Sequence, residues 1–333
     1  MIFHPGILAL LLGSMLITVM LGYSAYEGLR ILRNWDIASG SELQLQLERR
    51  TYLISTMMSY LLGFELLSLF LFVYTADTIS SLFVGAMCAA GSLKVNGFGY
   101  PTVIFKIVNF LMAGLWIIVN YTDNKAPDYP LIKIKYGLLL IIAPFLLAET
   151  SIQGGYFIGL KPNIITSCCG TLFTIDAQNI VSDLIAIPRK LSQAIFDSSV
   201  TVTLATGLYF YLQGKGAYLF SASSLIMFLV SIVAIISLIS IYFYELPTHH
   251  CPFCILHQEY GYVGYWIYAT LLVGAVSGLG VGSLMPLRRI PSIREVLPRI
   301  QKRLALISIL SYSAFVAIAG YGIVFSNLTM SAY

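Results

Sequence analysis

Long apolar runs constrain the fold of this chain more than any other feature. Each run approaches 20 residues, the length that a helix needs to cross the hydrocarbon core of a bilayer. Only 10% of the residues are charged and 58% are hydrophobic, whereas a soluble domain carries about 25% charged residues. We therefore expect an all-α polytopic membrane protein with about eight transmembrane helices, at residues 6–29, 51–75, 103–120, 134–153, 199–213, 219–244, 262–285 and 304–326.

The basic residues predict how the chain is oriented. Lys and Arg concentrate in the inner loops of membrane proteins, and fourteen of the nineteen basic residues fall in alternate loops, against four in the opposite ones. This bias predicts a single transmembrane domain over 1–333 with both termini outside. The net charge of +4 then reflects anchoring at the inner face or contact with lipid headgroups, and we expect no nucleic acid partner. The fourteen are Arg30, Arg33, Arg49, Arg50, Lys125, Lys133, Lys135, Lys215, Arg288, Arg289, Arg294, Arg299, Lys302 and Arg303.

Three extended segments are expected on the outer side, at 76–102, 154–198 and 245–262. The first is too apolar and rich in glycine for a free loop, so we expect it to pack against the helices or to dip into the membrane interface. The second carries an amphipathic stripe over its latter half, interrupted near Pro188, and is expected to form a surface helix or a lid over the outer site. The inner loops are short apart from a polar stretch at 34–50.

The third outer segment contains the motif Cys251-Pro252-Phe253-Cys254. Two thiols at this spacing can close a small disulfide ring, and a position at a helix start beside imidazoles would favour the reactive thiolate. The same spacing also serves zinc and iron–sulfur sites. The motif therefore leaves open a redox dithiol, a metal site or a structural disulfide. All five cysteines and all four histidines are expected on the outer side.

The sequence CPFCILHQE resembles the DsbB and vitamin K epoxide reductase class of membrane thiol oxidoreductases. Those proteins carry such a motif at the outer end of a transmembrane helix, beside a bound quinone, and a second cysteine pair in an outer loop. The resemblance implies that Cys251 and Cys254 are the pair next to the quinone. It covers about ten residues, and the core of those families has four helices, about half the number expected here.

A second pair of cysteines, Cys168 and Cys169, lies in the outer segment 154–198. By the same resemblance this pair would exchange electrons with an external partner, although the two residues are adjacent here, whereas the family's pair is spaced. Adjacent cysteines can form a strained and easily reduced disulfide, pair with other cysteines, or lie buried as small apolar residues. For Cys88 we expect a packed thiol among small residues.

Imidazole and carboxylate groups accompany the cysteine motif. His249 and His250 precede it, and together with Cys251 and Cys254 they form an alternative set of metal ligands. His257 is expected one helical turn below Cys254, where it could bind a quinone carbonyl, and Glu259 is a candidate for proton exchange. Covalent haem attachment is disfavoured because Ile255 stands where the motif C-x-x-C-H requires His.

Charged residues inside the apolar runs are scarce and therefore informative. Glu65 lies within 51–75 and Lys106 within 103–120, at depths that differ by about two helical turns. We expect a structural ion pair, a proton path or a contact to quinone. Glu149 and Glu245 fall near outer helix ends and are expected to be boundary residues.

These features favour electron transfer at the outer face of an energy-conserving membrane, most simply the bacterial cytoplasmic (inner) membrane. In this hypothesis electrons pass between quinone and a periplasmic or membrane redox partner, possible examples being cytochromes, through Cys251 and Cys254. One alternative is a non-catalytic subunit of a respiratory complex whose Cys and His residues contact a metal ion, an iron–sulfur cluster or the haem of a partner. A second alternative is a transporter, weakened by the scarcity of buried charge.

Overall fold

The computed structural model of the chain describes residues 3–37, 39–161, 165–166 and 187–328. The secondary structure of these residues is helical, joined by turns and irregular connections, and it holds one isolated β-bridge and no strand, which confirms the all-α fold class. Six helices among them are long and apolar enough to cross a membrane, so the chain is an integral membrane protein. The six are Pro5–Asn34, Glu42–Leu82, Gly99–Asp123, Ala217–Tyr244, Val263–Arg289 and Leu297–Val324.

Every predicted span coincides with a helix. The predicted spans 134–153 and 199–213 lie in α5 (Ile132–Ile158) and α7 (Arg189–Gln213), which are helical but do not belong to the six. The number of eight spans and the outer position of both termini therefore stay predictions.

Several helices are longer than the apolar runs that predict them. Helix α2 (Glu42–Thr78) has 37 residues, which at 1.5 Å a residue makes it about 55 Å long. The polar residues 42–50, predicted as part of an inner loop, thus continue this helix. Helix α7 likewise includes 189–198, which were predicted as part of the lid. The rest of the predicted lid stripe, 176–186, lies outside the described residues.

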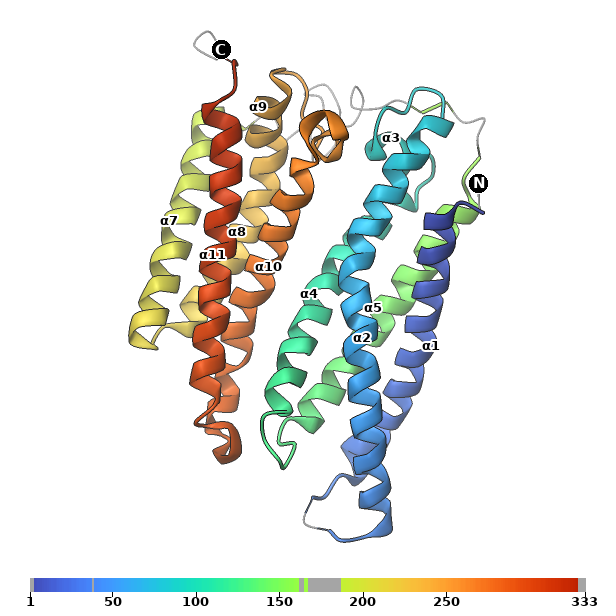
Figure 1. The fold of residues 1–333 in the computed structure, drawn as a ribbon, viewed down its shortest axis with the longest axis vertical. Helices are drawn as coiled ribbons and strands as arrows, with labels where there is room; N and C mark the ends of the chain where they lie inside the picture. Colours follow the sequence, from blue (N-terminus) through green and yellow to red (C-terminus); the bar gives the residue numbers. More distant parts are fainter. Residues whose placement is uncertain (1–2, 38, 162–164, 167–186, 329–333) are drawn as a thin grey trace. The chain divides into compact units, whose positions relative to one another are not determined.

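The chain divides into two compact units, the first of which comprises 1–75, 93–161 and 286–300. It is built on α1 (Pro5–Asn34), most of α2, α4 (Gly99–Asp123) and α5. Helix α5 packs against both α1 and α4 (Figure 1). The core of the first unit centres on the buried rings of Trp116 and Tyr136, and the Trp116 indole donates a 3.0 Å hydrogen bond to the Lys135 carbonyl.

Charged residues inside the first unit are paired. The Lys135 ammonium lies 2.7 Å from the Asp123 carboxylate, and Glu27 lies 2.5 Å from Arg50 and 3.2 Å from Arg30. Since an unpaired charge in an apolar interior is costly, these pairs allow charged side chains to be buried among the helices.

The second unit comprises 76–92, 162–285 and 301–333. It holds α3 (Ala89–Leu93), α7, α8 (Ala217–Ala234), α9 (Ser240–Tyr244), α10 (Val263–Ser283) and α11 (Leu297–Val324). Helix α8 continues into α9 through a wider π-helical turn at Ile235–Ile239. Helix α8 packs against α7 and α10, the latter at Gly278 and Gly282, where the chain has no side chain to hold the helices apart.

Candidate thiol centre

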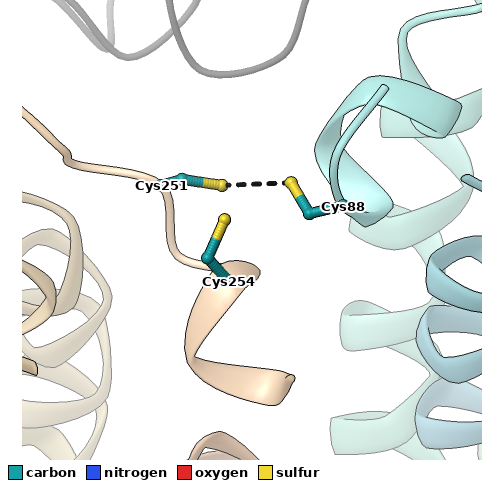
Figure 2. A group of neighbouring side chains, drawn as sticks. All are labelled: Cys88, Cys251 and Cys254. Carbon is teal, nitrogen blue, oxygen red and sulfur yellow. Dashed lines mark hydrogen bonds between the residues drawn. The ribbon is translucent and has the colours of Figure 1, made fainter. Parts of the chain in front are cut away.

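Three cysteines of the second unit converge on one point. The Sγ atoms of Cys88, Cys251 and Cys254 all lie within 4.8 Å of one another, and those of Cys88 and Cys251 are 3.7 Å apart. Figure 2 shows the Cys88 side chain pointing from one segment toward Cys251 and Cys254, which lie together on another. Cys88 and Cys251 have no exposed surface and Cys254 is 9% exposed, so the three thiols form a buried centre.

Cys88 is positioned by hydrogen bonds around the start of α3. Asp77, at the end of α2, accepts a 3.0 Å hydrogen bond from the Ala89 backbone N–H, next to Cys88. The Ser92 hydroxyl donates to the Ala76 carbonyl at 2.5 Å. The short helix is therefore fastened to the end of α2 at both of its ends. This agrees with the expectation that the segment 76–102 packs rather than forming a free loop.

The segments on both sides of Cys88 are bonded to residues 165–166. Val84 and Ile165 form a parallel β-bridge, and the Thr166 hydroxyl donates to the Gly91 carbonyl at 2.9 Å. Gly85 has a φ of +86°, and a Cβ there would collide with the Thr166 carbonyl oxygen. Glycine is thus required by both the backbone conformation and the close approach.

Cys251 and Cys254 lie in a connection between helices rather than at a helix start. Helix α9 ends at Tyr244, Cys254 begins a short 3-10 turn (Cys254–Leu256), and α10 begins only at Val263. His257 has an extended backbone after that turn, so the prediction that it lies on a helix one turn below Cys254 is wrong. The eight residues between Cys254 and α10 also remove the expected support of the thiolate by that helix's N-terminus.

Two tyrosine hydroxyls hold the cysteine motif in place. The Tyr244 hydroxyl donates to the Cys251 carbonyl at 2.5 Å and accepts from the Ile255 backbone N–H at 2.9 Å. The Tyr268 hydroxyl donates to the Pro252 carbonyl at 2.6 Å. A loop with few regular hydrogen bonds of its own thereby satisfies buried backbone groups with side chains.

His250 is oriented by the π-helical turn. Its Nδ1 lies 3.0 Å from the Ile236 carbonyl, which can only accept, so Nδ1 carries the proton. Burial lowers the pKa of His250 below its usual value, which favours the neutral ring. The turn at Ile235–Ile239 thus fixes the residue that precedes Cys251, and such turns are frequent at functional sites.

The other predicted polar residues of this segment lie around the thiols. His257 Nε2 is 2.8 Å from the Asp77 Oδ1, the carboxylate oxygen that also accepts from α3. His249 packs edge-on against Tyr244, with ring centroids 4.5 Å apart. Glu259 is exposed in a second 3-10 turn. Among the described residues, the group that could hold a metal ion consists of the three sulfurs and includes neither His249 nor His250.

Other predicted site residues lie elsewhere. Cys168 and Cys169 fall outside the described residues. Glu65 and Lys106 belong to the first unit, where Lys106 pairs with Glu149 as well as Glu65. The expectation that Glu149 is a boundary residue is therefore wrong, because its side chain is fully buried.

Cys88 is the residue that sequence reasoning missed. Its one signal was its expected position on the same outer side as the motif. The chemistry of the centre follows from its third sulfur: once two of the three cysteines are oxidised to a disulfide, the third can exchange with it, and three thiolates together can bind a soft metal ion. Comparison with protein-family models, curated proteins and solved structures finds no match for this chain.

Proposed function

We propose that this integral membrane protein is a thiol oxidoreductase that passes electrons at its outer face between an external partner and membrane quinone. The convergence of Cys88, Cys251 and Cys254 within 4.8 Å is the observation that carries the proposal. A disulfide is exchanged by attack of a thiolate on one of its sulfurs. A third sulfur beside a pair at C-x-x-C spacing makes such an exchange possible within one protein.

The proposed cycle balances electrons and protons as follows. A dithiol of the partner reduces the Cys251–Cys254 disulfide and leaves as a disulfide, and the two cysteines become thiols. Quinone then accepts two electrons and two protons from them and leaves as quinol. In the oxidised state, attack of the Cys88 thiolate on the Cys251 sulfur forms a Cys88–Cys251 disulfide and releases Cys254 as a thiolate.

Single Cys→Ser variants test this cycle. Cys254→Ser removes the thiol that resolves a mixed disulfide, so Cys251 is expected to become linked to Cys88, to a partner, or to Cys168 or Cys169. Peptide mapping and electrophoresis without reductant would detect these species, which reductant should remove. Cys88→Ser is the matched variant, in which the Cys251–Cys254 disulfide should still form.

Failure of every single variant to form a disulfide that reductant removes, under oxidising conditions, would contradict the thiol cycle. Loss of quinone reduction with intact disulfide exchange would instead restrict the proposal to its thiol half. The first outcome is read from the mapped linkage, and the second from quinone reduction by a variant whose disulfides still form.

A metal centre is a second candidate, favoured by the number and spacing of the sulfurs. Tetrahedral zinc with Zn–S bonds of about 2.3 Å holds its sulfurs about 3.8 Å apart, and Cys88 and Cys251 are separated by 3.7 Å. Three thiolates suit Zn²⁺ or Cu(I) and leave one position for another ligand. An iron–sulfur cluster would need a fourth protein ligand beyond these three cysteines.

Elemental analysis distinguishes the two candidates. A metal centre predicts one ion for each chain in the parent, its loss in each of the three Cys→Ser variants, and lower thermal stability after a chelator removes it. A visible absorption spectrum would reveal haem or iron–sulfur clusters contributed by a partner. A parent protein that contains no metal, and whose thermal stability a chelator does not lower, contradicts the metal candidate.

A further inference from the structure

Three charged side chains meet inside the first unit, away from any cysteine among its described residues. Lys106 of α4 extends its ammonium between Glu149 of α5, at 2.6 Å, and Glu65 of α2, at 3.6 Å. None of the three residues is more than 1% exposed. Two carboxyl groups thus share one ammonium in the interior of an apolar bundle.

The charge of Lys106 is matched by Glu149. One carboxylate oxygen of Glu149 contacts the ammonium, and the other accepts a 2.5 Å hydrogen bond from the Asn109 amide. Both oxygens of Glu149 therefore have strong donors, as an ionised carboxylate requires. The pair is neutral as a whole, and no second cation pairs with Glu65 in the part of the chain that the structure describes.

Glu65 has the surroundings of a neutral carboxylic acid. Its contact to Lys106 is the longer one, and its Oε2 atom is buried with no hydrogen-bond partner among the described residues. The Ser68 hydroxyl lies 2.9 Å from Glu65 Oε1 but also 2.8 Å from the Glu65 carbonyl. The Lys106 ammonium donates a 2.9 Å hydrogen bond to the same hydroxyl. When the single hydroxyl proton goes to the carbonyl, a protonated Glu65 can donate to the hydroxyl oxygen, whereas an ionised Glu65 cannot.

We propose that Glu65, Lys106 and Glu149 form a buried proton-binding site in which Glu65 carries an exchangeable proton. An ionised Glu65 would leave one uncompensated negative charge in a membrane-spanning bundle, which is far more costly than a neutral acid. Binding and release of this proton changes the charge of the site by one. The site is independent of the thiol centre and of its proposed function.

The elements around the site contribute no other charge to it. Helix α2 supplies Glu65 with Ser68 and the Phe72 ring, whose centroid lies 5.7 Å from the Lys106 ammonium. Helix α4 supplies Lys106 and Asn109, and α5 supplies Glu149. Helix α1 packs against α5 through Ser14 and Thr18, which bond Gln153 and Thr150 and do not titrate. The same buried face of α5 also carries Tyr156, one turn beyond Gln153, and Lys135, about four turns before Glu149 and paired with Asp123.

Infrared spectroscopy of the purified full-length protein at neutral pH tests the proposal. A protonated carboxylic acid gives a C=O band separate from carboxylate bands, and the band shifts in D₂O if the proton exchanges. The parent should show such a band, and Glu65→Gln should lack it. Glu27→Gln is the matched control, because Glu27 is held by Arg30 and Arg50 and should contribute no acid band.

Two further variants keep the test decisive if Glu65→Gln does not fold. In Glu149→Gln, Lys106 has one remaining carboxyl partner, so Glu65 should ionise and the band should disappear although Glu65 is present. In Lys106→Gln both carboxyls should be protonated, and a second acid band should appear. A parent without an exchangeable acid band, or a band that persists in Glu65→Gln, overturns the proposal.

Discussion

The Tyr244 hydroxyl holds the cysteine motif through two hydrogen bonds. It satisfies two buried backbone groups at once, the Cys251 carbonyl and the Ile255 N–H. Tyr244→Phe leaves both without this partner, and each unsatisfied buried group costs about 1–3 kcal/mol. We predict a lower midpoint of thermal unfolding in detergent and faster reaction of Cys254 with a thiol reagent than in the parent.

Tyr268→Phe is the matched control for this prediction. It removes the same hydroxyl group from a buried tyrosine, but only one hydrogen bond, to the Pro252 carbonyl. Its effect should be about half as large. Equal unfolding midpoints and equal thiol reactivity in Tyr244→Phe and the parent would show that the motif does not depend on this hydroxyl.

At the residue scale, a contact could be predicted from the sequence when two charged residues lie at similar depths in neighbouring apolar runs. Glu65 and Lys106 were expected to meet because their positions in two apolar runs are similar, and they do. Cys88 was not expected to meet the cysteine motif. Its position depends on the hydrogen bond from Ala89 to Asp77, 12 residues earlier, and on the one from Thr166 to Gly91, 75 residues earlier, and no local pattern predicts either.

At the scale of the element, the existence of each long helix was predictable, whereas helix ends and the short helix α3 were not. Apolar runs near 20 residues report the part of a helix that lipid surrounds, whereas helix hydrogen bonding continues into polar sequence. Polar residues in 42–50 have partners that stabilise the helix there. Arg50 pairs with Glu27 of α1, and Gln44 donates a hydrogen bond to Glu48 one turn later. The cysteine connection was expected to be a helix start. It is a 3-10 turn of three residues, which is too short to show a recognisable pattern in the sequence.

The packing of α10 against α8 leads to a second prediction. A Cβ at Gly278 would lie 2.6 Å from the Ser224 Cβ, so any larger side chain must push the two helices apart. Gly274, Gly278 and Gly282 recur every fourth residue, a pattern of close helix packing in membranes that is visible in the sequence. Gly278→Leu should destabilise the second unit by about 1–3 kcal/mol or more, measured by thermal or denaturant unfolding.

Gly320→Leu serves as the control for overpacking. Gly320 is also inside a long helix of the second unit, α11, but a Cβ there meets no atom within 4 Å among the described residues. Replacement by leucine adds the same volume and the same helix propensity without forcing helices apart. If both variants unfold like the parent, the close approach of α8 and α10 is not required for stability.

At the scale of the whole molecule, the number of spans and the position of the termini are separate questions. Six spans and eight spans are both even numbers, so either places the two termini on the same side. The excess of Lys and Arg in alternate loops then predicts that this side is the outer one. The two numbers disagree only about the connection between α5 and α7, which is outside if both helices cross the membrane and inside if neither does.

Lys161, which follows α5 and is exposed, distinguishes the two topologies. With eight spans, a membrane-impermeant maleimide added outside intact cells should label Lys161→Cys beyond the level of the parent. With six spans it should label this variant only after the membrane is opened. Lys94→Cys and Lys215→Cys are controls, because both are exposed and both topologies place the first outside and the second inside. We predict outside labelling at position 161. The polar side chains of α5 such as Glu149 and Gln153 are buried and hydrogen-bonded to neighbouring helices, so they do not oppose insertion of this helix.

Labelling of position 161 from the inner side alone would establish six spans, and labelling of position 215 from outside would reverse the predicted orientation.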